Sequence, residues 1–137
     1  MSEVGNPFPK LPHGRPFLLV DRVLSIGDGR GTFVKLVTAA DPCTAPDGTL
    51  PAAFVLEALA QSGGALLGAL AEGSRPEAGY LAAVDDFEMH SEARVGDELR
   101  LDVEIVRHFA AATLFHGSAR VGDRTVADAR FTLALPR

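Results

Sequence analysis

The segment from Pro51 to Ala71 is the feature that most limits how this chain folds, because only Glu57, Gln61 and Ser62 interrupt its apolar character. Pro51 suits the first turn of a helix, where its missing N–H costs nothing, and Gly73 suits the end of one. The segment predicts a helix of about 22 residues, roughly 33 Å long. A helix that is apolar nearly all round is covered by other elements on most of its sides. We therefore expect a central, buried helix.

A membrane span is the alternative for this segment, since its length is enough to cross a bilayer. An acid at the centre of such a helix costs about 2.5–3.5 kcal/mol to insert, and its many Ala and Gly residues add little hydrophobic gain. No basic stretch followed by an apolar one opens the chain. The sequence favours the core of a soluble, cytoplasmic protein with no membrane contact.

The charge balance and the single cysteine exclude several classes of function. Thirteen basic and 18 acidic side chains give a formal charge of −5, which argues against binding to nucleic acid or to an anionic membrane. One cysteine excludes an intrachain disulfide and a cysteine-based zinc site. The four histidines lack the i, i+4 spacing of a helical metal site. We expect no metal.

The rest of the chain alternates apolar and polar residues with the period of two that is typical of strands. A glycine-rich turn over 27–31 separates the first two strands, a Pro- and Asp-containing loop covers 40–49, and Gly122-Asp123 indicates a hairpin between the last two. The predicted strands are 17–26, 32–39, 79–84, 99–105, 113–121 and 125–135. Together they predict one α+β domain over residues 1–137, with about six mostly antiparallel strands around one helix.

One face of the predicted helix carries candidate chemistry. Glu57, Gln61, Gly64 and Gly68 share this face, and its two glycines either leave space for a ligand or allow close backbone packing. An acid in an apolar helix is costly unless it is paired or functional. Glu57 is thus a candidate catalytic residue, and its alternative is a structural pair or a solvent-facing edge. Gln61 lies one turn on and can orient the Glu57 carboxyl group.

The start of the same helix offers a second element. The backbone N–H groups of Ala52 and Ala53 have no partner within the helix and suit the polarisation of a carbonyl oxygen.

Three blocks of the sequence resemble the 3-hydroxyacyl-acyl carrier protein dehydratases. They are LPHGRPFLLVDRV at 11–23, LPAAFVLEALAQ at 50–61, and VGDEL at 95–99 followed by an alternating strand. The blocks stand in the family's order over most of the chain. The resemblance implies the hot-dog fold, in which an antiparallel sheet wraps a long helix and subunits pair through sheet edges. The DGTLP run at 47–51 is more similar to the dehydratase-like branch of aryl-polyene and polyketide pathways.

The resemblance also implies a reaction. This family removes water from a 3-hydroxyacyl thioester carried on a phosphopantetheine arm, by an acyl carrier protein or coenzyme A, and gives a trans-2-enoyl product without a metal or redox cofactor. A histidine takes the proton next to the thioester, and a carboxylate from the other subunit's helix helps to expel the hydroxyl. Carried over by position, Glu57 is that carboxylate, Gln61 its orienting partner, and Ala52 an amide donor, with Ala53 beside it.

The sequence departs from the family pattern just before the helix. Cys43 stands where the family carries its loop histidine, and Ala52 replaces a glycine. A cysteine near its ordinary pKa is a poor substitute for imidazole, and its alternative is a small buried hydrophobe. His13 is the only histidine within a resembling block, so it is the candidate base of this chain, with a structural role as its alternative.

Three functions remain open at this point. The first is an acyl-carrier-protein-linked dehydratase or isomerase of fatty-acid or polyketide-type biosynthesis, acting as a homodimer or as a heterodimer with a related hot-dog subunit. The second is a non-catalytic acyl-binding partner subunit, which the missing histidine suggests. The third is a thioesterase on the same fold, in which the helix acid activates water. Because acyl carrier protein is acidic, its docking needs a basic patch, for which Lys10, Arg15, Arg22 and Lys35 are the nearest candidates.

Overall fold

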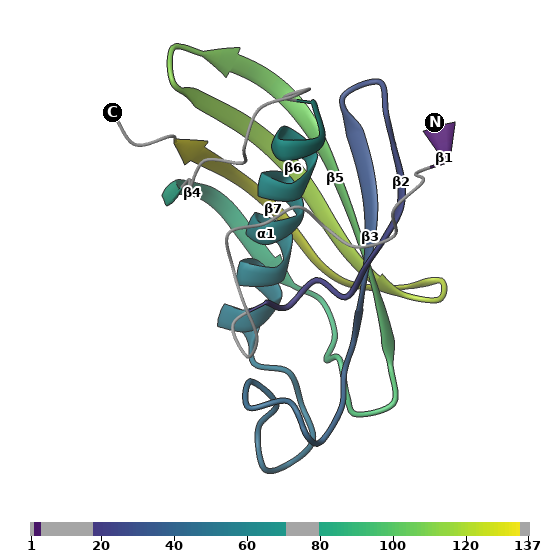
Figure 1. Cartoon of the computed structure of the whole chain (residues 1–137). Helices are drawn as coiled ribbons and strands as arrows, with labels where there is room; N and C mark the ends of the chain where they lie inside the picture. Colours follow the sequence, from purple (N-terminus) through teal and green to yellow (C-terminus); the bar gives the residue numbers. More distant parts are fainter. Residues whose placement is uncertain (1, 4–17, 71–79, 135–137) are drawn as a thin grey trace.

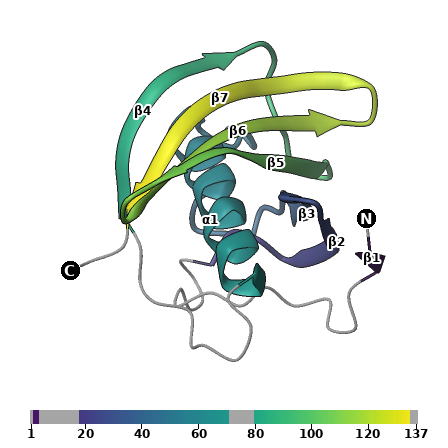
Figure 2. The ribbon, with the colours of Figure 1, turned by 90° about the horizontal axis from the view of Figure 1, so that it is seen from above.

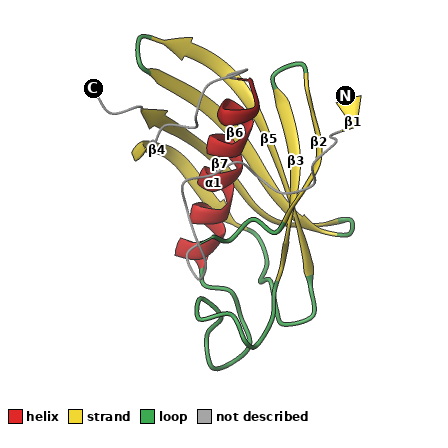
Figure 3. Cartoon of the chain, viewed as in Figure 1, coloured by secondary structure: helices red, strands yellow, loops and turns green. Residues whose placement is uncertain are grey.

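One helix and one antiparallel sheet make up the described part of the chain, which in this computed structural model is residues 2–3, 18–70 and 80–134. The helix α1 spans Ala52–Leu70. The strands are β1 (Ser2–Glu3), β2 (Arg22–Gly27), β3 (Arg30–Leu36), β4 (Tyr80–Met89), β5 (Glu98–Phe109), β6 (Ala112–Val121) and β7 (Arg124–Ala134). They are ordered β1-β2-β3-β5-β6-β7-β4 (Figures 1 and 3). This confirms the predicted hot-dog architecture, with the two-residue β1 added to six longer strands.

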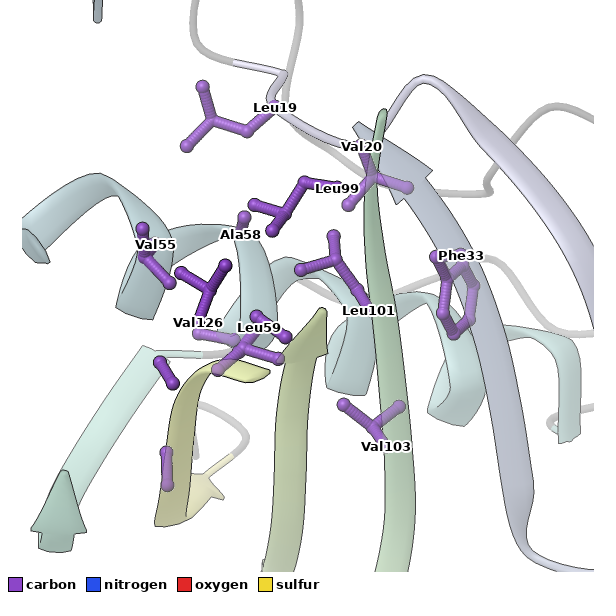
Figure 4. Close-up of a cluster of buried hydrophobic side chains, with 14 of the residues drawn as sticks. Leu19, Val20, Phe33, Val55, Ala58, Leu59, Leu99, Leu101, Val103 and Val126 are labelled. Atoms are coloured by element: carbon purple, nitrogen blue, oxygen red, sulfur yellow. The ribbon is translucent and has the colours of Figure 1, made fainter. Parts of the chain in front are cut away.

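The sheet curves around α1, so that the helix lies in its concave side (Figure 2). The helix packs mainly on β3, β5, β6 and β7, and less on the edge strand β4. Leu59 and Leu66 of α1 are fully buried against inward-facing side chains such as Leu101 and Phe115, and Figure 4 shows part of this cluster. Burial of each such side chain contributes about 1.5–3 kcal/mol. Although α1 is long and apolar enough to span a membrane, it is the core helix of this fold.

The helix and the strands differ from their predicted bounds in ways that tertiary contacts explain. The first long strand begins at Arg22 and not at residue 17, because Leu19 and Val20 are buried and the backbone N–H of Leu19 bonds to α1. β4 continues past Val84 to Met89. Its exposed acidic residues end the apolar run that predicted the strand. The helix is described only to Leu70, so its predicted end at Gly73 lies outside the described residues.

The loop between β3 and α1 is fastened to the segment just before β5. Val37 exchanges backbone hydrogen bonds with Gly96 and Asp97, Leu50 N–H donates to Ala93, and Val95 N–H donates to Gly48. Gly48 and Gly96 both have positive φ, of 86° and 95°, which glycine adopts without steric cost. The VGDEL block at 95–99 and Ala93 therefore hold in place the loop that leads into the helix.

The helix approaches the sheet closely at two glycines, one on α1 and one on β6. A Cβ on Gly63 of α1 would lie 3.2 Å from Leu133 and Phe131 and 3.3 Å from Phe115. A Cβ on Gly117 of β6 would lie 3.2 Å from Leu59 and from Phe131. The close approach thus involves Gly63, the neighbour of the predicted Gly64. At the middle of the helix, a side chain on either glycine would therefore be in tight contact with its neighbours.

We expect Gly117→Val to destabilise the protein by about 1–3 kcal/mol, because two methyl groups would enter a core that is already packed. Urea unfolding followed by circular dichroism measures the change. Ser118→Val is the matched control, since Ser118 is the next residue on β6 and is only half-buried. An equal effect of both substitutions would contradict close packing at Gly117.

Candidate functional site

Glu57 and Gln61 lie one turn apart on α1 and are joined by a hydrogen bond. Gln61 Nε2 donates to Glu57 Oε1 at 3.0 Å, and Gln61 Oε1 accepts the backbone N–H of Leu19 at 2.7 Å. The Gln61 side chain is 2% exposed, whereas Glu57 is half-buried. Both the nitrogen and the oxygen of the Gln61 amide are therefore hydrogen-bonded, and the amide orients the Glu57 carboxyl group. This is the arrangement that the sequence predicted for the pair.

The first turn of α1 lies at the surface close to this carboxyl group. Ala52, Ala53 and Phe54 are exposed, while Val55 is fully buried. Phe54 and Val55 N–H groups bond to the Pro51 carbonyl, whereas the N–H groups of Ala52 and Ala53 come too early in the helix for such a bond. Two backbone donors and a carboxyl group thus share one end of the helix, and this geometry suits the binding of a carbonyl oxygen.

Cys43 lies in the loop before α1, within the electrostatic reach of Glu57. Its backbone N–H donates to Asp41 Oδ1 at 2.9 Å. Burial raises the pKa of the Cys43 thiol, and the carboxylates of Asp41 and Glu57 raise it further against the opposing effect of Lys35. Cys43 is therefore a neutral thiol and not an activated nucleophile. Of the predicted substrate-binding residues, Cys43 lies in the loop before α1, Ala52 and Ala53 lie at the start of α1, and Gln61 lies in the middle of the helix.

A buried ion pair lies beneath this loop. The Lys35 side chain is 2% exposed and its ammonium donates to Asp41 Oδ2 at 2.5 Å. Burial opposes ionisation of Asp41, but hydrogen bonds from Lys35 and from the Cys43 backbone, together with the Lys35 charge, hold the pKa of Asp41 below its ordinary value. Lys35 was predicted as a candidate for a basic docking patch. That prediction is wrong, because its charge is buried and paired.

A pocket of about 320 Å³ opens beside this pair. It lies between the end of β3, the start of the following loop and the segment that precedes β2, and its lining combines apolar and charged side chains. The lining residues are Leu18, Asp21, Lys35, Leu36, Thr38, Ala40, Asp41 and Pro42.

The three described histidines have partners elsewhere. His90 Nε2 lies 3.0 Å from Asp128, His108 Nδ1 lies 3.0 Å from Thr113 Oγ1, and His116 Nδ1 lies 3.5 Å from Glu104. His13, the predicted base, is outside the described residues, so its role stays a prediction. Among the residues that the structure describes, no group of three or more His, Cys, Asp or Glu side chains is placed to hold a metal ion.

Sequence reasoning missed the Lys35–Asp41 pair. Lys35 lies two residues after the buried Phe33 and therefore on the same face of β3, and a lysine at a buried position signals a buried partner. Asp41 was read only as a loop residue, and nothing in its local sequence separates it from Asp47, which bonds to Thr49 in the same loop.

Comparison with known proteins identifies the family. A family model described as ApeP dehydratase matches residues 7–137. The chain belongs to the ApeP-like dehydratase family. The 3-hydroxyacyl-[acyl-carrier-protein] dehydratase FabZ of Histophilus somni is 38% identical over 129 residues, which cover 90% of this chain and 85% of that protein. FabZ of Actinobacillus pleuropneumoniae is 35% identical over 133 residues, covering 93% and 86%.

Solved structures agree with this fold. The dehydratase heterocomplex ApeI:P from Xenorhabdus doucetiae contains a chain that superimposes with a TM-score of 0.86 at 20% identity, covering 95% of this chain and 92% of that chain. A hypothetical thioesterase from Streptococcus pneumoniae superimposes with a TM-score of 0.69 at 15% identity, covering 83% and 84%. At these identities the likeness concerns the fold. The family match confirms the predicted dehydratase class.

We expect Gln61→Leu to lower the free energy of unfolding by about 1–3 kcal/mol, since it leaves the buried Leu19 N–H without its acceptor. Thermal and urea unfolding measure this loss. Ser62→Ala serves as the control, because the buried Ser62 hydroxyl donates only to the Ala58 carbonyl of its own helix. A Gln61→Leu protein as stable as the Ser62→Ala protein would contradict the bridging role of the amide.

Proposed function

We propose that this chain supplies the carboxylate half of a shared 3-hydroxyacyl-thioester dehydratase site, and that a related hot-dog subunit supplies the imidazole. The observation that carries the proposal is the pairing of an intact Glu57–Gln61 unit with a cysteine at position 43. The carboxyl group and its orienting amide are retained, while the loop has lost the residue that serves as the base in the family it resembles. The proposed substrate is carried by an acyl carrier protein or coenzyme A, in the cytoplasm, in fatty-acid or polyketide-type biosynthesis.

The proposed reaction is a balanced elimination. The partner's imidazole takes a proton from C2 of the 3-hydroxyacyl thioester, and the electron pair of that C–H bond forms the C2=C3 double bond. The C3–O bond breaks, and the hydroxyl leaves as water with a proton from Glu57. The N–H groups of Ala52 and Ala53 stabilise the negative charge that develops on the thioester oxygen. The proton on the imidazole returns to Glu57 between turnovers, so the proposed reaction consumes no cofactor.

The edge strand β4 supports the presence of a second subunit on this side of the sheet. Among the described strands, β4 pairs only with β7. Leu81 and Val84 oppose the buried Leu133 and Phe131 on the concave face, yet they are 37% and 41% exposed in the single chain. The helix α1 therefore leaves the β4 edge of the sheet uncovered. A partner that adds a strand here would bury these apolar side chains together with the unpaired backbone groups of β4.

The charges of β4 favour a different subunit over a second copy of this chain. The strand carries Asp85, Asp86 and Glu88 and no basic residue, and all three acids are exposed. Two such strands side by side would bring six carboxylates together, whereas an edge with neutral or basic side chains would not. The heterocomplex from Xenorhabdus doucetiae shows that a protein of this fold is found with a second dehydratase subunit, which supports the same choice.

The catalytic test uses the chain with its own partner. The partner is purified with the chain from the native host, confirmed by mass spectrometry to be a hot-dog subunit with the loop histidine, and reconstituted. We expect the mixed assembly to hydrate trans-2-enoyl thioesters, and Glu57→Gln to reduce kcat at least about 100-fold because it removes the acid. Glu98→Gln is the control, since Glu98 is an exposed acid at the start of β5.

The same assay decides between this proposal and a self-sufficient enzyme. Full activity of the chain alone that is lost in His13→Ala would contradict the shared site and would favour the predicted internal base. Release of free thiol from acyl-coenzyme A that depends on Glu57 would favour a thioesterase instead.

We expect Asp85→Asn/Asp86→Asn to increase self-association at least about tenfold, because removing two like charges from β4 relieves repulsion between copies. Sedimentation equilibrium of the isolated chain measures this association. Asp123→Asn/Glu98→Gln makes the same change in net charge at exposed positions outside β4. Equal behaviour of the two double variants, or a tight wild-type homodimer, would contradict the selection of the partner by the acids of β4.

A further inference from the structure

Three arginines from three strands lie in one row across the sheet. Arg22 of β2 stands opposite Val34 of β3. Val34 in turn stands opposite Arg100 of β5, which stands opposite Arg120 of β6. The row spans three spacings between neighbouring strands, which is about 14 Å. Arg22 is far from the other two arginines in the sequence, so only the order of the strands brings their charges together.

The row lies on the convex face of the sheet, away from the helix (Figure 2). Each arginine has a core residue next to it in its own strand, and these residues are Val23, Leu101 and Ala119. Figure 4 shows Leu101 among the side chains that gather against α1. Because successive side chains of a strand point to opposite faces, the three arginines point away from the helix.

Two of these guanidinium groups carry charges that no acid neutralises. Arg120 lies 3.0 Å from the Asp102 carboxylate. Within the described part of the chain, neither Arg22 nor Arg100 has an ion-pair partner, and both are exposed, with Glu98 as the exposed acid beside the row. Salt screens charges beyond about 8 Å, so a partner at this face senses the row more than the net charge of −5. The row therefore favours an acidic partner.

The length of the row favours an extended acidic surface over a single phosphate group. A phosphate engages one or two guanidinium groups at hydrogen-bond distance. Two turns of an α-helix, by contrast, are about 11 Å long and present side chains three and four residues apart along one face. Leu36 lies two residues after Val34 on the same face of β3 and is 48% exposed, so it offers an apolar contact beside the charges.

The row is also close to the end of the sheet that leads to the candidate site. The next pair of residues along β3 and β5 is Leu36 and Glu98. Directly beyond it, Val37 exchanges backbone hydrogen bonds with Gly96 and Asp97, which hold the loop that enters α1. A protein bound on this row therefore lies at the end of the molecule where the helix begins.

We propose that Arg22, Arg100 and Arg120 form a docking surface for the acidic helix of a carrier protein. The proposal rests on the proposed function for its partner, because acyl carrier protein is the acidic protein that would present the thioester. It selects that carrier over coenzyme A, which has no acidic helix. Of the predicted docking residues, Arg22 belongs to this surface, while Lys10 and Arg15 lie outside the described residues.

Carrier binding tests this surface without any turnover. The chain is purified from its native host with any subunit bound to it, and it is titrated into the host's fluorescently labelled acyl carrier protein. Fluorescence anisotropy then gives Kd. We expect Arg100→Glu to raise Kd at least about tenfold and to weaken its dependence on salt, because it reverses a charge within the row. Arg107→Glu makes the same change nearer the other end of β5 and is the matched control, expected to leave Kd within about twofold.

The outcomes separate the docking surface from the dehydratase site. Equal Kd values for Arg100→Glu and Arg107→Glu, or no carrier binding by the wild-type protein, would overturn the docking surface. If Arg100→Glu does not fold, Arg22→Glu repeats the test at an exposed position at the end of the row, with the same direction expected. Binding that depends on Arg100 without any dehydration would reject the proposed function alone, and dehydration with a Kd independent of Arg100 would reject the docking surface alone.

Discussion

The amide of Gln61 is the interaction on which both the core and the candidate site depend. Its oxygen accepts the backbone N–H of Leu19 and its nitrogen donates to Glu57. A buried backbone donor needs an acceptor, and no apolar side chain provides one. Gln61 therefore joins the segment before β2 to the helix and also orients the Glu57 carboxyl group. One side chain thus serves both the fold and the candidate site.

The helix packs closely on the middle of the sheet and leaves apolar side chains of the edge strand β4 exposed. Gly63 and Gly117 bring α1 against the middle of the sheet, where no further side chain fits. The helix cannot also cover β4, so Leu81 and Val84 remain exposed although they face the concave side. The exposed helix start at Ala52 belongs to the same end of α1 as Glu57. In the proposed assembly, a subunit added to β4 would cover Leu81 and Val84.

The sequence predicted the parts of the structure that depend on local pattern. The period of two in 99–105 and the glycine turns gave the strands, and the apolar run gave the helix with Glu57 and Gln61 on one face. What it missed depends on long-range contacts. The backbone at Leu19 leaves the expected strand to reach Gln61, β4 continues through acids because it is an edge, and Lys35 is buried because Asp41 neutralises it. None of these partners is a sequence neighbour that a local pattern could show.

The charges around residue 43 bear on what a side chain there can do. The Lys35–Asp41 pair holds the loop backbone in place whatever side chain position 43 carries, because the bond is to the backbone N–H. The carboxylates of Asp41 and Glu57 would raise the pKa of a histidine there, and the imidazolium form that they favour cannot accept a proton. A cysteine in the same field stays neutral. The loop thus keeps its geometry around a neutral side chain, which accords with the proposal that a partner subunit supplies the base.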